Sequence, residues 1–323
     1  MGNYIIRRTL INIPVILVIL TLVFFATSVL PGDFVAQRIA QQNPTGNTAE
    51  EREAQIQAIR KDLGVDKPLV QRYIDYVANT MRGDLGTSFR TRQPALQVFK
   101  DGLPYTLQLS LLTLFVALVT SIPIGIISAI KQDSWVDYIL RVVAILGVAA
   151  PSFWVATILL LSVVRWKLWT IDLIGQPLLW DDPWGSLRLY ALPALAGGFA
   201  SGAGVMRLLR SQMLEVLRQD YIRTAWSKGL RERVIIVRHA LKNAMIPVLT
   251  VIGLTIAGLI SGNVVMEYLF GIPGVGGRIL GAITQRDVPV VQAFVLVIAT
   301  FVVFVNLAVD VLYGWLDPRI RCS

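Results

Sequence analysis

The stretch Arg223–Thr250, RTAWSKGLRERVIIVRHALKNAMIPVLT, changes character along its length. Its first half is rich in arginine and lysine, which is typical of a segment in water. Its second half begins an apolar run that continues to Met266. A soluble protein has no surface that tolerates such a run, so the sequence predicts that the chain enters a membrane here.

The composition of the whole chain also indicates a membrane protein. Of its 323 residues, 54% are hydrophobic and 16% are charged, and the mean hydropathy is +0.61, which is too apolar for an ordinary soluble protein. The net charge of +9 would suit nucleic acid, but the basic residues lie beside apolar runs, where lipid headgroups and membrane topology explain them better. We therefore expect membrane lipid, and no nucleic acid, as a partner. Cys322 is the single cysteine, so no intrachain disulfide can form.

Six uncharged runs are each about as long as the roughly 20 residues that a helix needs to cross a bilayer. The fourth is short and glycine-rich, but small residues let neighbouring helices approach closely, so we expect it to pack inside the bundle. The first is too long for a typical signal-peptide core and lacks a cleavage pattern, so we expect a retained span. The predicted fold is all-α, a polytopic membrane protein with six transmembrane helices: Thr9–Leu30, Leu103–Ile130, Val142–Val164, Leu189–Met206, Asn243–Met266 and Val288–Val309.

Lysine and arginine in the short loops predict the orientation. If the N-terminus is cytoplasmic, the inner segments hold 15 basic residues, nine of them between Arg207 and Lys242, whereas the short outer loops hold five. This bias places both termini in the cytoplasm. It also divides the chain into a first span (1–30), an extracytoplasmic segment (31–102), a five-helix core (103–313) with a cytoplasmic loop (207–242), and a cytoplasmic tail (314–323).

The extracytoplasmic segment 31–102 is predicted to be helical. Thr48 stands three residues before Glu51, which is the spacing of a capping box, and Gly64 is placed to end that helix. A second helix is expected after Pro68, because apolar residues recur every four positions from Leu69 to Met81. The segment is either a cap that holds the spans together or a dock for an external partner.

The cytoplasmic loop 207–242 is predicted to form a rigid elbow. Asp220 can cap a short helix, YIRTAWSK, and Gly229 can end it in a left-handed conformation. A second helix is expected from about Glu232 to Asn243, with Pro247 where the chain enters the membrane. The alternative is a basic loop that only follows the positive-inside rule, although charge does not require a compact knob of Ala225, Trp226 and Gly229.

The sequence lacks the common motifs for nucleotide binding, catalysis and metal binding. It has no G-x-x-x-x-G-K-[ST] phosphate loop, so any ATP must be used by another subunit. The glycine-rich run Phe270–Gly281, FGIPGVGGRILG, does not match a dinucleotide motif and is expected to be a shaped turn at the outer mouth, with Phe270, Pro273, Gly274 and Gly276 in it. His239 is the only histidine, which leaves no serine-hydrolase triad and no metal site.

Few charges occur near the predicted spans, and they lie at span ends, which disfavours an ion-coupled transporter. These residues are Arg141, Arg207, Glu267 and Asp310.

Six blocks of the sequence, in order, resemble one known family. Residues 209–254, LRSQMLEVLRQDYIRTAWSKGLRERVIIVRHALKNAMIPVLTVIGL, look like the EAA loop of binding-protein-dependent ABC importer permeases. Ala225 matches the last alanine of that pattern and Gly229 its glycine, while Arg223 and Thr224 replace the first two letters and Lys242 stands at the usual proline. The other blocks resemble the first, B-type permease of the dipeptide, oligopeptide, nickel and glutathione group: IIRRTLINIPVILVILTLVFFATSVLPGD, LGVDKPLVQRYIDYVANTMRGDLGTSF, FGIPGVGG, RDVPVVQAFVLV and VNLAVDVLYGWLDPRIR.

This resemblance implies a non-enzymatic permease subunit that imports di- or oligopeptides, with nickel or glutathione as alternative substrates. It implies a second homologous permease subunit, two ATP-binding subunits or a fused pair, and an extracytoplasmic solute-binding protein, in a bacterial inner membrane. ATP and Mg²⁺ would be used by the ATPase, and this chain would hold no cofactor. The EAA loop would be the helix that couples the ATPase to the spans, through Asp220, Tyr221, Arg223, Thr224, Ala225, Trp226, Lys228 and Gly229.

Overall fold

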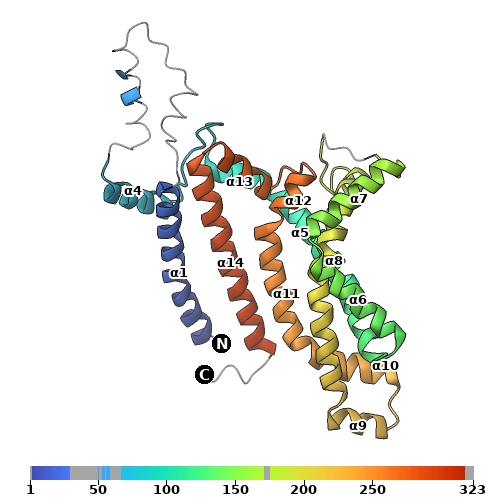
Figure 1. Cartoon of the computed structure of the whole chain (residues 1–323). Helices are drawn as coiled ribbons and strands as arrows, with labels where there is room; N and C mark the ends of the chain where they lie inside the picture. Colours follow the sequence, from blue (N-terminus) through green and yellow to red (C-terminus); the bar gives the residue numbers. More distant parts are fainter. Residues whose placement is uncertain are drawn as a thin grey trace. The chain divides into compact units, whose positions relative to one another are not determined.

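The computed structural model describes residues 2–29, 50, 53–54, 56–58, 67–170 and 175–316. In these ranges the regular elements are helices (Figure 1), and the only strand-like pairing is a single β-bridge between Thr87 and Pro94. The predicted helix that begins near Thr48 falls mostly outside the described residues.

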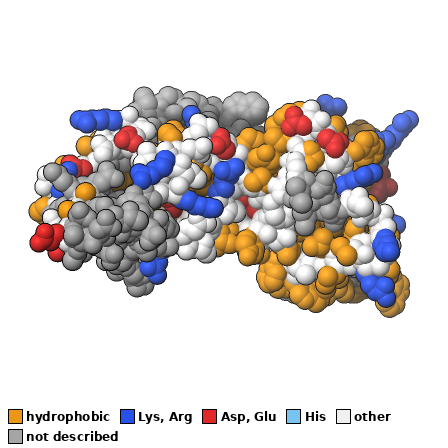
Figure 2. Space-filling model, turned by 90° about the horizontal axis from the view of Figure 1, so that it is seen from above, with side chains coloured by type: hydrophobic (Ala, Val, Ile, Leu, Met, Phe, Trp, Pro, Cys, Tyr) orange, Lys and Arg blue, Asp and Glu red, His pale blue; other side chains and the backbone are white. Residues whose placement is uncertain are grey.

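Five of the helices are long and apolar enough to cross a membrane, or six if one bent pair counts as a single span. Many of their large apolar side chains are exposed, as contact with hydrocarbon requires, and such side chains form patches on the face shown in Figure 2. The structure therefore confirms an all-helical polytopic protein. The five helices are α1 (Gly2–Val29), α5 (Ala95–Ile130), α8 (Pro183–Leu217), α11 (Lys242–Gly262) and α14 (Val288–Leu316).

The third predicted span is not one continuous helix. It divides into α6 (Trp135–Ala149) and α7 (Ser152–Trp166), which are bent by 100° relative to each other. Proline has no N–H for the helical ladder and disfavours helical geometry in the residue before it. Accordingly, Ala150 is extended, with φ −80° and ψ 127°. The prediction of an unbroken helix through Val142–Val164 is therefore wrong at Pro151.

The chain forms two compact units, which are described separately. The first comprises Met1–Ile6, Gly102–Gly277 and Phe301–Ser323, and the second comprises Arg7–Asp101 and Arg278–Thr300. The first unit contains α6 to α11 and the short helix α12 (Val264–Leu269), whereas the second contains α4 (Leu69–Met81) and most of α13 (Val275–Thr284).

Helix α8 is the centre of the first unit, where it packs against α6, α7 and α11. In its most apolar stretch 67% of the residues are buried, compared with 17 to 33% in the other four candidate spans. Its glycines allow close contact with α5, because a Cβ at Gly198 would lie 2.6 Å from Val116 Cβ and one at Gly202 would lie 2.8 Å from the Ala117 carbonyl oxygen. The expectation that this glycine-rich run packs inside the bundle is confirmed.

In the second unit, α4 contacts α1, and the turn between α13 and α14 contacts residues 88–89. Tyr73 of α4 shares a 2.8 Å hydrogen bond with Thr21 of α1. Asp287, between α13 and α14, accepts hydrogen bonds from the Ser88 hydroxyl at 2.5 Å and the Phe89 amide at 3.0 Å. The predicted helix after Pro68 is present as α4, and Gly83 follows it with φ +83°.

Candidate functional site

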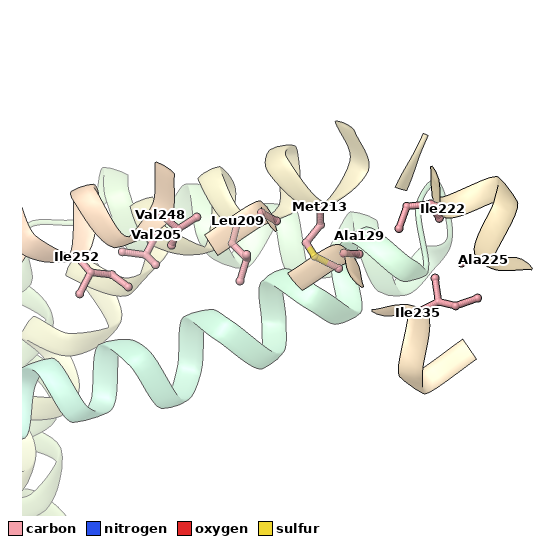
Figure 3. Close-up of a cluster of buried hydrophobic side chains, with 11 residues drawn as sticks. Ala129, Val205, Leu209, Met213, Ile222, Ala225, Ile235, Val248 and Ile252 are labelled. Atoms are coloured by element: carbon pink, nitrogen blue, oxygen red, sulfur yellow. The ribbon is translucent and has the colours of Figure 1, made fainter. Parts of the chain in front are cut away.

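A short helix, α9 (Asp220–Ser227), projects between the end of α8 and the start of α11. Two of its residues, Ile222 and Ala225, are buried, because their three-residue spacing places them on one face. They join a core that includes Leu209 and Met213 of α8 and Ile235 (Figure 3). Burial of these apolar side chains fixes α9 on the ends of the neighbouring helices. Ala225 is therefore part of the core and not part of the exposed surface.

Asp220 does not cap α9 as the sequence suggested. The residue before the helix is Gln219, which makes no side-chain capping bond, and Asp220 is the first helical residue. Its carboxylate lies 3.4 Å from Arg223 Nη1, and both side chains are largely exposed, so this ion pair adds little stability. The Thr224 hydroxyl donates to the Asp220 carbonyl oxygen at 3.0 Å. A carboxylate in the first turn still interacts favourably with the helix dipole.

A glycine turn ends α9, as the sequence predicts. Lys228 follows the helix, and Gly229 takes the left-handed conformation with φ +73°. The Gly229 amide donates to the Trp226 carbonyl oxygen at 2.9 Å. A Cβ at Gly229 would meet nothing within 4 Å, so glycine is favoured here by its backbone conformation and not by space.

The outer face of α9 and the turn combines apolar and basic side chains. Tyr221, Trp226 and Leu230 are exposed by 44%, 48% and 38%. The basic side chains around them are also exposed: Arg223, Lys228, Arg231 and Arg233. An exposed aromatic anchor among cations is the composition expected of a protein-binding surface.

The chain continues from this turn into the membrane without a break. A single helical turn, α10 (Glu232–Val234), leads into a π-helix, η1 (Ile235–Leu241), and then into α11. The predicted end of a separate helix near Asn243 is therefore wrong, and Pro247 lies inside α11. Asn243 Nδ2 donates to Tyr221 Oη at 2.8 Å and to the His239 carbonyl oxygen at 3.0 Å. This side chain ties α9 directly to the start of α11.

The glycine-rich segment Phe270–Gly281, expected to be a turn, is more buried than an open turn. Phe270 is fully buried and Pro273 is half-buried, and α13 begins already at Val275. Gly274 and Gly276 are needed for close packing, because a Cβ at Gly274 would lie 2.4 Å from the Glu267 carboxyl carbon and one at Gly276 would lie 2.7 Å from Val264 Cα.

Glu267 is the residue around which this segment folds. It is 1% exposed, and its carboxylate accepts hydrogen bonds from Thr106 of α5 at 2.6 Å and from the Gly277 amide at 2.9 Å. The Val275 amide donates to the same Thr106 hydroxyl at 2.8 Å. Burial raises the pKa of the Glu267 carboxyl, and the hydrogen bonds oppose that rise. From the sequence, Glu267 is recognisable as a charge at a span end, but its partners are not.

Another buried carboxylate, Asp137 of α6, has no signal in the sequence. It pairs with Arg210 of α8, 73 residues away in sequence.

Across the described ranges, His, Cys, Asp and Glu side chains form no group of three or more that could hold a metal ion.

Comparison with known proteins gives the family. Residues 121–321 match the family described as "Binding-protein-dependent transport system inner membrane component". Residues 1–110 match "Binding-prot-dependent transport system membrane comp, N-term".

Full-length relatives agree with these matches. A dipeptide transport system permease protein of Escherichia coli K12 is 37% identical over 343 residues, which cover 99% of each chain. One from Alkalihalophilus pseudofirmus is 37% identical over 340 residues, 98% of this chain and 99% of the relative. A glutathione transport system permease protein of Pectobacterium atrosepticum is 36% identical over 321 residues, 99% of each chain. The chain therefore belongs to the family of inner-membrane components of binding-protein-dependent transport systems.

Proposed function

We propose that this multi-pass inner-membrane chain is the permease subunit of an ATP-driven importer of di- or oligopeptides. It forms half of the translocation path, and a second, homologous permease subunit forms the other half. The peptide substrate is supported by the dipeptide permeases of two bacteria that match over nearly their whole length. A glutathione permease matches almost as well, so glutathione, itself a small peptide, is the second candidate. The sequence resemblance leaves nickel as a further alternative.

The geometry of α9 supports its role as the contact with a separate ATPase. Its inner face is fixed in the core, its outer face carries exposed Trp226 and Tyr221 among cations, and the Asn243 hydrogen bond joins it to α11. A displacement of α9 must therefore move the ends of α8 and α11 with it, because packed interfaces move as units and do not deform continuously. This continuity between an exposed helix and two spans is the observation that carries the proposal.

The remaining partners follow from the family. Two ATP-binding subunits, or a fused pair, use ATP and Mg²⁺, and an extracytoplasmic solute-binding protein delivers the substrate. This chain catalyses no reaction and holds no cofactor. The excess of basic residues around α9 supports a cytoplasmic position for that helix and for both termini.

Reconstitution tests the proposal. The chain is purified from its native host with the subunits that assemble with it, and uptake of a labelled dipeptide into proteoliposomes is measured with the solute-binding protein present. We expect uptake that requires both ATP and the ATPase subunits. Uptake by the isolated chain along an ion gradient would instead identify an ion-coupled transporter.

A further inference from the structure

A fully buried carboxylate joins three helices next to the α5–α6 turn. Arg210 of α8 donates two hydrogen bonds to Asp137 of α6, from Nε to Oδ1 at 2.9 Å and from Nη2 to Oδ2 at 2.7 Å. Ser128 of α5 donates a third at 2.5 Å, and the Asp133 amide donates a fourth at 3.1 Å. The four bonds occupy the acceptor positions that a carboxylate offers, and Arg141 Nη2 of α6 lies 3.5 Å from Asp137 Oδ2 as a further ion-pair partner. A two-bond fork between Arg210 and Asp137 also fixes their relative orientation.

This ion pair lies next to the core that holds α9. Leu209 and Met213 flank Arg210 on α8, and Ala129 follows Ser128 on α5. All three apolar residues belong to the same buried cluster as Ile222 and Ala225 of α9. The same turns of α8 therefore hold α9 through apolar contacts and α6 through the ion pair.

The other buried residues of α6 are small. Besides Asp137, the buried residues of α6 are Ala144 and Gly147. A Cβ at Gly147 would lie 2.9 Å from the Phe199 ring and 3.1 Å from Ala203 Cβ. Small buried residues on α6 allow a close approach to α8, but they offer few interlocking side chains that would set the position of α6 along the helix axis. The directional bonds of Asp137 supply that constraint.

We propose that Asp137 and Arg210 are a positioning pair that makes α6 follow α8 when α9 is displaced. The proposal rests on the function proposed above, in which the ATPase contacts α9. The pair touches neither substrate nor ATPase, and it acts by holding α6 in one register on α8. Without it, α8 moves on ATP binding and α6 follows incompletely, so that ATP is hydrolysed with less transport.

Replacement of both charges separates positioning from stability. A buried ion pair can often be exchanged for apolar side chains of similar volume without loss of stability, whereas removal of one partner leaves an unpaired buried charge. The test variant is therefore Asp137→Leu with Arg210→Met. Arg141, the other cation beside Asp137, is 36% exposed and keeps its contact with the Tyr138 ring. A second variant, Arg210→Lys, keeps the charge but loses the planar fork. The matched control, Lys67→Met with Asp75→Leu, removes an exposed ion pair of the second unit.

The measurements are made on the assembled complex in proteoliposomes. Thermal unfolding, ATP hydrolysis and uptake of a labelled dipeptide are recorded for each variant. We expect the double apolar variant to assemble and unfold close to the wild-type temperature, while dipeptide taken up per ATP hydrolysed falls about fivefold or more, as for loss of a typical coupling between sites. In Arg210→Lys the amount of dipeptide taken up per ATP hydrolysed should fall less, and in the control variant it should not change.

A wild-type ratio of uptake to ATP hydrolysis in both Asp137/Arg210 variants would overturn the proposal. Failure of both variants to assemble would also overturn it, because the pair would then serve folding alone. These outcomes differ from failure of the proposed function, in which the wild-type complex itself would take up dipeptide without the ATPase, or not at all.

Discussion

Gly274 lies against the Glu267 carboxyl, with no room for a side chain. We expect Gly274→Ala to lower the stability of the purified complex by about 1–3 kcal/mol, because the added methyl group must displace a hydrogen-bonded carboxylate. The midpoint of thermal unfolding in detergent measures the effect. Gly204→Ala in α8 is the matched control, since a Cβ there meets nothing within 4 Å and alanine favours a helix. Equal midpoints for Gly274→Ala and Gly204→Ala would show that the contact has no role.

Gly229 has space for a side chain but an unfavourable backbone for one. At φ +73°, we expect Gly229→Val to strain the turn by about 1–2 kcal/mol and to lower dipeptide uptake per ATP hydrolysed while the chain still inserts. Gly229→Asn is the control, because asparagine tolerates the left-handed region. Assays in proteoliposomes compare the two variants. Unaltered uptake and ATP hydrolysis in Gly229→Val would argue against a coupling role for the turn.

Single residues differ in how far the sequence reveals them. The left-handed turn at Gly229 could be predicted, because it depends on the residues next to it. The position of the N-cap could not, since Gln219 takes it and Asp220 becomes the first helical residue. The partners of Asp137 and Glu267 lie 73 and 161 residues away, and only the packing of the helices brings them together.

At the scale of the element, α9 has an inner and an outer face with different expected sensitivities. Trp226→Ala removes an exposed ring and should weaken binding of the ATPase by about tenfold or more, a typical loss for an aromatic anchor, without changing the unfolding midpoint. Ile222→Ala removes a fully buried side chain and should instead destabilise the fold by about 2–5 kcal/mol. Titration of the permease with purified ATPase and thermal unfolding separate the two effects. An unfolding defect in Trp226→Ala with normal ATPase binding would contradict the assignment of faces.

Most of the long elements could be predicted from hydropathy, but their exact ends and most of their irregularities could not. The length of each apolar run indicates a span, but it does not show that α8 extends to Leu217 or that α5 begins at Ala95. The break before Ser152 did have a signal, since Pro151 stands inside an apolar run. The π-helix Ile235–Leu241 had none, because its composition suits an α-helix equally well and tertiary packing selects between them.

At the scale of the whole molecule, the charge bias predicts on which side of the membrane each exposed segment lies. Single cysteines are introduced at Ser227 in α9 or at Thr91 in the outer segment, both exposed, after Cys322→Ser. A membrane-impermeant maleimide should label Thr91→Cys in intact spheroplasts, and Ser227→Cys only after permeabilisation. Labelling in the opposite order would invert the proposed orientation.

The bend between α6 and α7 limits what can surround it. Each helix has 15 residues and is about 22 Å long, so neither alone covers the ~30 Å of acyl chains. At the joint, carbonyl groups that end α6 and amides that begin α7 lose their helical partners. Fatty-acid tails cannot supply hydrogen bonds to them, and irregular backbone at that depth persists only beside protein or trapped water. If the pair crosses the bilayer with this joint among the acyl chains, the backbone of the joint is therefore wetted or covered by a neighbouring subunit, and lipid is excluded from it.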